Sequence, residues 1–214
     1  MPFEKYKDLW ELKENHFHRI HPDKAAVIFL DCKDVTRNHK QYDLLERDLI
    51  YRLLSNAAFN VAKETELSCT IYAGIDEVSI LFPDVQWLMG YFRVGDCADY
   101  ILSLFMQRFL KHFWKDYPEI YLKGTLFQLP PKDINRYLKY RQEVCKAVSM
   151  FYVAKENLPT EKYRRLPFEV EPIKELLLKE DLYQILSCHI DFFEGIRIDY
   201  RADETPRLWM ELIR

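Results

Sequence analysis

Two short apolar segments around an acidic turn constrain the fold of this chain more than any other feature. The segments are Cys69–Ala73 and Val78–Phe82, and the turn between them is Gly74-Ile75-Asp76-Glu77. Two β-prone segments joined by a short turn are typical of a β-hairpin. Adjacent carboxylates at such a tip repel each other, and divalent cations relieve this repulsion because they bind carboxylate oxygens. The segment therefore predicts a hairpin with a metal-binding tip, with an ordinary acidic turn as the alternative.

A second acid, Asp31, directly follows the apolar segment Ala25–Leu30. This segment predicts an interior strand, and Asp31 would lie where the backbone leaves the core. Taken alone, Asp31 is more simply a solvated residue at a strand end. If the first strand lies beside the hairpin, however, Asp31 and Asp76 meet at one end of the sheet, as the acids of a two-metal phosphoryl-transfer site do. Glu77 is either a further ligand or a structural neighbour, because adjacent side chains in a strand point to opposite faces.

The order of the expected elements predicts the fold class. We expect a helix over 3–16, a strand over 25–31, a helix over 41–63, the hairpin over 68–82, a helix over 97–114, a strand over 119–129 and a helix over 132–154. This order is that of an α+β fold, the ferredoxin-like palm of polymerases, in which an antiparallel sheet has helices on one face. We assign residues 1–154 to a palm-type nucleotidyltransferase core. Residues 155–214 would form a helical C-terminal extension that packs on the palm, with helices near 172–178 and 180–190.

Composition narrows the class of protein further. The chain has 214 residues, a formal net charge of −3 and five Gly residues, and it contains no G-x-G-x-x-G or Walker A motif. Any contact with RNA therefore needs a local basic patch. Five scattered Cys without C-x-x-C pairs indicate reduced thiols, and no apolar run approaches the length of a membrane span. We expect a cytoplasmic protein with no membrane partner.

Two groups of cations are candidates for phosphate contacts. The loop after the first strand carries Lys33, Arg37 and Lys40, which could clamp a triphosphate or could simply be solvated. The helix expected over 132–154 carries basic residues among tyrosines, which could contact RNA phosphates or stack on a base, or could form a charged exposed face. These residues are Arg136, Lys139, Arg141 and Lys146.

In their order and spacing, these motifs resemble those of the tRNA-histidine guanylyltransferases and related 3′-to-5′ RNA polymerases. The D-G-R type motif that ends the family's first strand is similar to Asp31-Cys32-Lys33, and its hairpin Q-S-D-E is similar to Gly74–Glu77. The family's W-R-Q followed by Cys is similar to Tyr140–Cys145. The resemblance spans roughly residues 20–200.

The resemblance implies addition of nucleotides to the 5′ end of a tRNA-like RNA, in the 3′-to-5′ direction, with two Mg²⁺ ions and with ATP and GTP as substrates. It implies metal binding by Asp31 and Asp76, with Cys32 and Glu77 as further candidates. It also implies that the protein is a homodimer or homotetramer. The basic residues of the late helix remain the candidates for the RNA contacts. The nucleotide-binding residues that it implies are Lys33, Asp34, Val35, Thr36, Arg37, Lys40 and Ile75.

Several positions depart from the family pattern. Cys32 stands where the family has Gly, Ile75 stands where it has a hydroxyl, and Lys123 and Thr125 replace an Asp and an Arg. The family's H-I-N-N-L-Y-N segment corresponds to Lys146–Tyr152. Two alternatives therefore stay open. One is a catalytically degenerate palm that binds RNA or a protein. The other is a palm-type cyclase that makes a signalling nucleotide.

Overall fold

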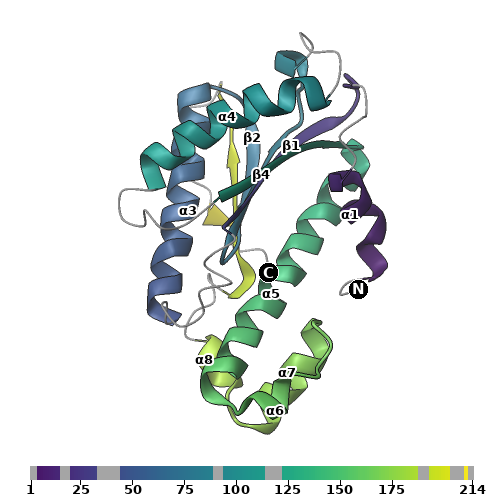
Figure 1. Cartoon of the computed structure of the whole chain (residues 1–214). Helices are drawn as coiled ribbons and strands as arrows, with labels where there is room; N and C mark the ends of the chain where they lie inside the picture. Colours follow the sequence, from purple (N-terminus) through teal and green to yellow (C-terminus); the bar gives the residue numbers. More distant parts are fainter. Residues whose placement is uncertain are drawn as a thin grey trace.

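The computed structural model shows a sheet with helices on both faces and a group of short helices below it (Figure 1). It describes residues 4–14, 20–32, 44–88, 94–113, 122–187, 193–202 and 210–211.

Within the described residues, the sheet contains six antiparallel strands in the order β4-β1-β3-β2-β5-β6. The strands are β1 (Ala25–Cys32), β2 (Cys69–Ala73), β3 (Glu77–Phe82), β4 (Leu122–Leu129), β5 (Ile196–Tyr200) and the short β6 (Met210–Glu211). The order β4-β1-β3-β2 confirms that the first strand lies beside the hairpin. The expected α+β palm is likewise confirmed.

The helices follow the expected order. The α-helices are α1 (Lys7–Glu14), α3 (Leu44–Thr65), α4 (Val94–Phe113), α5 (Ile134–Asn157), α6 (Thr160–Tyr163), α7 (Val170–Lys179) and α8 (Tyr183–Ser187). Three 3₁₀ turns, η1 (Glu4–Tyr6), η2 (Gln86–Leu88) and η3 (Pro131–Asp133), complete the described elements.

Helices cover both faces of the sheet, whereas we expected them on one face. On one side lie α3 and α4, where the Phe105 ring of α4 packs 5.6 Å from the Phe82 ring of β3. The other side is crossed by α5, whose Tyr137 hydroxyl lies 2.9 Å from the Ser79 hydroxyl of β3. The strands allow this second layer because β1 and β3 bury apolar side chains at successive positions, not at alternate ones.

The C-terminal half of α5 builds a second small core with the helices that follow it. Buried side chains of α5 pack with Tyr163, Ile173, Leu177 and Leu186 of α6, α7 and α8. This cluster agrees with the expected helical extension. Because α5 continues to Asn157, the expected division between residues 154 and 155 falls within this helix.

Two strands, β5 and the short β6, were not predicted from the sequence. β5 lies beside β2, with Tyr72 opposite Arg197, so the end of the chain returns to the palm. The alternation of Ile196, Ile198 and Tyr200 was the available signal. The turn into β5 uses Gly195, whose φ of +78° is in the left-handed region.

None of the helices in the described part of the chain is both long and apolar enough to cross a lipid bilayer.

Replacing Gly195 should weaken the attachment of β5. An added Cβ would lie 2.6 Å from Cζ of Tyr72 and 2.9 Å from the Ala73 carbonyl oxygen, and the positive φ adds strain. We expect Gly195→Ala to lower the free energy of unfolding by about 1–3 kcal/mol in urea denaturation. The comparison variant is Gly124→Ala, whose backbone has no positive φ and whose Cβ would meet side-chain atoms of Leu102 at 2.5 to 2.9 Å. An equal or smaller loss for Gly195→Ala would contradict this account of the turn.

Candidate functional site

The pairing of β1 with β3 brings Asp31 and Asp76 to the same end of the sheet. Asp31 of β1 lies directly opposite Glu77 of β3. One residue further, the main-chain N–H of Cys32 donates to the carbonyl oxygen of Asp76 over 2.7 Å. The turn itself is closed by Gly74, whose N–H donates to the Glu77 carbonyl oxygen over 2.8 Å. The two aspartates are therefore neighbours at the point where β1 ends and the hairpin turns.

Both aspartates act electrostatically on the same buried thiol. Burial, then the charge of Asp76 and then that of Asp31, raises the pKa of Cys32 well above its usual range. Asp76 is 7% exposed and Asp31 is half-buried. Among the described residues, no lysine, arginine or histidine forms an ion pair with Asp31. The two acids thus share this end of the sheet, where Lys123 of β4 lies directly opposite Asp31.

Glu77 forms a buried ion pair with Arg141 of α5. Its Oε1 accepts from Nε of Arg141 over 2.6 Å, and its Oε2 contacts Nη2. The guanidinium lies over the Phe29 ring, with Cζ 4.6 Å from the ring centroid. Gly74 leaves room for this arrangement, because a Cβ there would lie 3.2 Å from Cγ of Glu77. The structure thus directs the Glu77 carboxylate to a cation of the chain itself.

One face of α5 packs along the hairpin, from strand β3 to the turn at Gly74. Tyr137, Arg141, Cys145 and Ser149 recur every four residues, so they share one side of the helix. Tyr137 contacts β3, and Cys145 lies against the turn, with its Sγ 3.5 Å from where a Cβ on Gly74 would be. This face of α5 therefore covers one side of the hairpin that carries Asp76.

Arg47 of α3 is a residue of the site that sequence reasoning missed. Its side chain is 1% exposed, and its guanidinium Cζ lies 3.8 Å from the ring centroid of Tyr152 on α5. Tyr152 also connects Arg47 with the acids, because burial and the charge of Asp76 raise the pKa of Tyr152 and the charge of Arg47 lowers it. Burial and the charge of Arg47 lower the pKa of Lys155. The available signal was that Arg47 continues the apolar stripe of α3 that includes Ile50.

The donor set fits a magnesium ion that is shared with a substrate. Within the described residues, no group of three or more His, Cys, Asp or Glu side chains is arranged to hold a metal. Mg²⁺ is, however, usually held by one or two carboxylates together with substrate phosphates. Asp31 and Asp76 can supply such a pair, so the residues are compatible with the expected metal.

The predicted nucleotide-binding residues fall largely outside the part of the chain that can be described. Lys33, Asp34, Val35, Thr36, Arg37 and Lys40 all lie there. Ile75 is described and is completely buried in the hairpin turn. Its side chain therefore belongs to the core, and only its main chain could reach a ligand.

The basic residues predicted to bind RNA do not form one free surface. Arg136 donates to both carboxylate oxygens of Asp8, over 2.5 and 2.8 Å, and Lys146 lies 2.8 Å from Glu194. Lys139 is exposed. Arg141 is buried against Glu77, and this burial argues against a contact with RNA.

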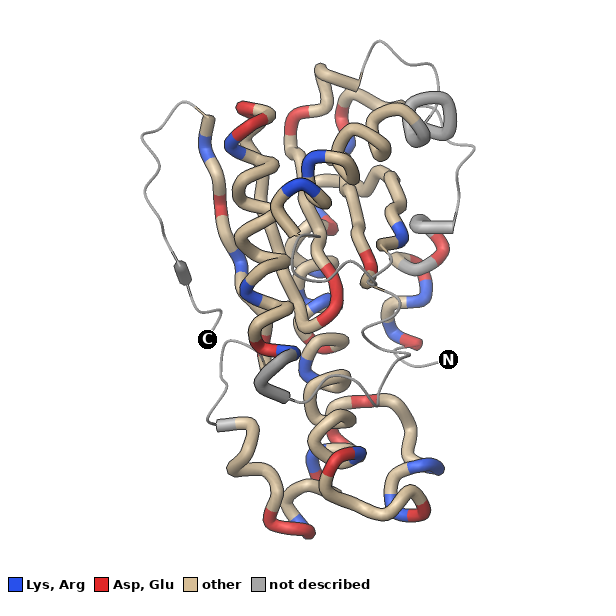
Figure 2. The backbone as a smooth tube through the Cα atoms, turned by 60° about the vertical axis from the view of Figure 1, so that its left-hand side comes forward, with Lys and Arg blue, Asp and Glu red and all other residues tan. Residues whose placement is uncertain are grey.

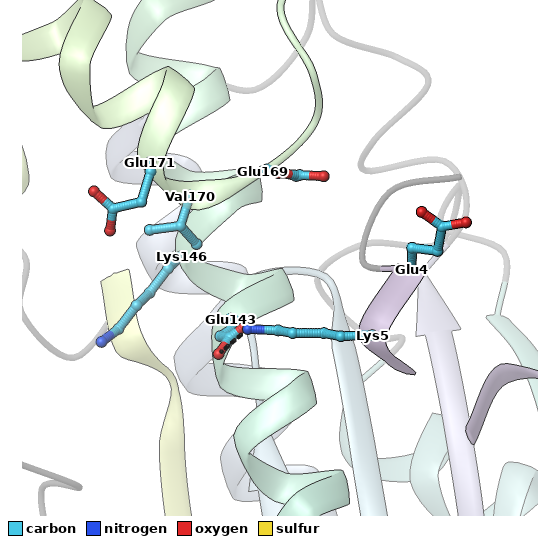
Figure 3. A pocket seen from close by; sticks show the side chains of 7 residues that line it. All are labelled: Glu4, Lys5, Glu143, Lys146, Glu169, Val170 and Glu171. Atoms are coloured by element: carbon cyan, nitrogen blue, oxygen red, sulfur yellow. Dashed lines mark hydrogen bonds and ion pairs between the residues drawn. The ribbon is translucent and has the colours of Figure 1, made fainter. Parts of the chain in front are cut away.

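A cleft of about 470 Å³ lies between α5, the N-terminal turn and the start of α7 (Figure 3). Lys5 crosses its mouth to Glu143, with Nζ 2.8 Å from Oε2. Its four carboxylates outnumber its two lysines, so its charge does not favour a phosphate. The lining residues are Glu4, Lys5, Glu143, Lys146, Glu169, Val170 and Glu171, and neither aspartate of the site is among them.

The buried thiols give the site a defined pH dependence. Burial raises the pKa of Cys145 from 9.0 to about 11. Between these two pKa values, the thiol keeps its proton in the folded protein and loses it in the unfolded chain. Its contribution to stability is therefore complete below about pH 9 and is lost as the pH rises toward 11. In urea titrations between pH 8.5 and 10.5, the free energy of unfolding should fall less steeply for Cys145→Ala than for the wild type, by up to about 1.4 kcal/mol per pH unit. Equal slopes would contradict the burial of this thiol.

Solved structures with a similar fold include a tRNA(His) guanylyltransferase and guanylyltransferase-like proteins. A bacterial tRNA(His) guanylyltransferase-like protein in complex with ATP matches with a TM-score of 0.63 and 16% identity, over 97% of this chain and 92% of that chain. A bacterial guanylyltransferase-like protein in complex with GTP matches with a TM-score of 0.63 and 18% identity, over 92% and 84%. The tRNA(His) guanylyltransferase of Saccharomyces cerevisiae matches with a TM-score of 0.61 and 16% identity, over 98% and 97%.

No protein-family model and no curated protein matches the sequence. The structural matches nevertheless cover nearly the whole chain and agree with the order of strands and helices described above. The chain therefore has the palm-type fold of the tRNA(His) guanylyltransferases, at low sequence identity.

Proposed function

We propose that this protein is a metal-dependent nucleotidyltransferase that adds nucleotides to the 5′ end of an RNA in the 3′-to-5′ direction. The observation that carries the proposal is the meeting of Asp31 and Asp76 at one end of the sheet, where the Cys32–Asp76 main-chain hydrogen bond joins their strands. Structural neighbours that were solved with ATP and with GTP support nucleoside triphosphates as substrates.

In this proposal, Asp31 and Asp76 hold Mg²⁺ through their carboxylates, and the main chain at Cys32 lies beside them. Bound Mg²⁺, as two ions in sites of this kind, would offset charge on the triphosphate and lower the pKa of the attacking hydroxyl. The buried face of α5 excludes water behind the acids. Arg47 supplies positive charge at the same end of the molecule, and the cations of the 33–40 loop are candidates to bind the triphosphate.

The acceptor in this proposal is the 5′ end of a tRNA-like RNA. Support comes from the family resemblance and from the guanylyltransferase neighbours. Figure 2 shows basic and acidic residues interspersed over the described backbone, so RNA would meet local groups of cations. Lys139 is the exposed candidate on α5.

We further propose a homodimer or homotetramer in the cytoplasm.

A specific observation favours a second candidate, a catalytically degenerate palm that binds RNA or protein. Cys32 is completely buried at the position where the family has Gly. A side chain at this position restricts how closely a metal or phosphate can approach the main chain. If this restriction is severe, the fold would keep its binding role and lose catalysis.

Substitution of either aspartate should abolish metal-dependent nucleotide transfer. We expect Asp31→Asn and Asp76→Asn each to lower the rate at least about 100-fold, or about 2.7 kcal/mol, because each removes a charged ligand of the metal. The assay is transfer of label from GTP or ATP to 5′-monophosphorylated and 5′-triphosphorylated tRNA. The matched control is Asp23→Asn, an exposed aspartate just before the opposite end of β1, which should keep full activity.

The products separate the candidate functions. Extension of the RNA 5′ end that requires Mg²⁺ supports the transferase. A cyclic or oligomeric nucleotide formed without RNA would identify a cyclase instead. If the wild type binds Mg²⁺–GTP no better than Asp76→Asn in calorimetry, the degenerate palm is the better description.

A further inference from the structure

Three carboxylates lie at this end of the sheet: Asp31 is on β1, Asp76 is in the hairpin turn and Glu77 begins β3. Asp31 and Glu77 face each other across β1 and β3, so their side chains project from the same face of the sheet. Asp76 precedes Glu77 directly. Like charges placed opposite each other in a sheet destabilise it. Even so, the described residues contain no group of three acids, thiols or imidazoles that could hold a metal.

Glu77 forms a buried ion pair with Arg141. Both of its carboxylate oxygens contact the guanidinium, and the two side chains are only 7% and 6% exposed. The guanidinium also contacts two aromatic rings, with Cζ 4.6 Å from the Phe29 centroid and 5.0 Å from that of Tyr140. Two bonds to the carboxylate and two ring contacts leave Arg141 little freedom to move.

The charge of Arg141 also acts on the two aspartates. Burial lowers the pKa of Arg141 to about 10, while Tyr72, Asp76 and Asp31 act in the opposite direction. At neutral pH the guanidinium is therefore a fixed cation. It lies within the same cluster of acids in which the metal is expected.

We propose that Arg141 is a built-in counter-ion that keeps Glu77 out of the metal site, so that Asp31 and Asp76 are its only side-chain ligands. The inference rests on the proposed function for the metal at these two aspartates. Two carboxylates hold Mg²⁺ weakly unless phosphate oxygens complete its coordination. Arg141 thereby makes metal binding depend on the nucleotide, and it acts as a positioning residue through Glu77.

The test is a titration with Mn²⁺ alone, followed by electron paramagnetic resonance of the free ion. Arg141→Met releases Glu77 as a third carboxylate, so we expect its apparent affinity for Mn²⁺ to be at least about tenfold tighter than that of the wild type. Mn²⁺ should also raise its thermal midpoint more than that of the wild type. The matched control is Arg52→Met, which breaks the exposed Arg52–Asp48 pair of α3 and should leave the affinity unchanged.

A second variant keeps the proposal testable if Arg141→Met does not fold. Glu77→Gln leaves the charge of Arg141 uncompensated beside Asp31 and Asp76, so it should weaken Mn²⁺ binding at least about threefold. The double variant Arg141→Met/Glu77→Gln should return to within about twofold of the wild type, because it removes both charges.

The outcomes distinguish the counter-ion from the proposed function. An affinity of Arg141→Met that is equal to or weaker than that of the wild type, or an unchanged affinity of Glu77→Gln, would overturn the counter-ion. Binding of Mn²⁺ alone by Arg141→Met but not by the wild type would support the counter-ion, and failure of the wild type to bind Mn²⁺ even with GTP present would count against the native metal site. Absence of binding in both proteins, with Mn²⁺ alone and with GTP added, would refute both ideas.

Discussion

The antiparallel pairing of β1 with β3 is the constraint on which the candidate site depends. It places Asp31 opposite Glu77 and continues into the turn through the Cys32–Asp76 main-chain hydrogen bond. A shift of this pairing by one residue would turn every side chain of one strand to the other face. The apolar side chains on both faces of β1 and β3 oppose such a shift, because it would disturb the packing against α4 and α5.

Local sequence patterns were sufficient to predict the palm and the end of the sheet where the acids meet. The apolar segment Ala25–Leu30 and the hairpin around Gly74 are specified by neighbouring residues, and short-range patterns of this kind predict strands and turns well. The adjacency of Asp31 and Asp76 followed from one further assumption, that the first strand pairs with the hairpin. The structure confirms this pairing.

The missed features all depend on contacts between residues far apart in the sequence. β5 is a strand because it pairs with β2, more than 120 residues earlier, and its Arg197 and Asp199 weaken its apolar pattern. Arg141 was expected on an exposed basic face, but it is buried because Glu77, 64 residues earlier, supplies a carboxylate. Arg47 is buried in a similar way, against an aromatic ring of another helix. Propensity does not reveal which charged residue will find such a partner.

The most direct test of the central claim is a crystal structure of the protein with Mn²⁺ and GTP. The account predicts an anomalous peak for the metal at ligand distance, roughly 2.1 Å, from carboxylate oxygens of both Asp31 and Asp76. Arg141 should stay paired with Glu77. A metal bound elsewhere, or a guanidinium between the two aspartates with no metal present, would contradict it.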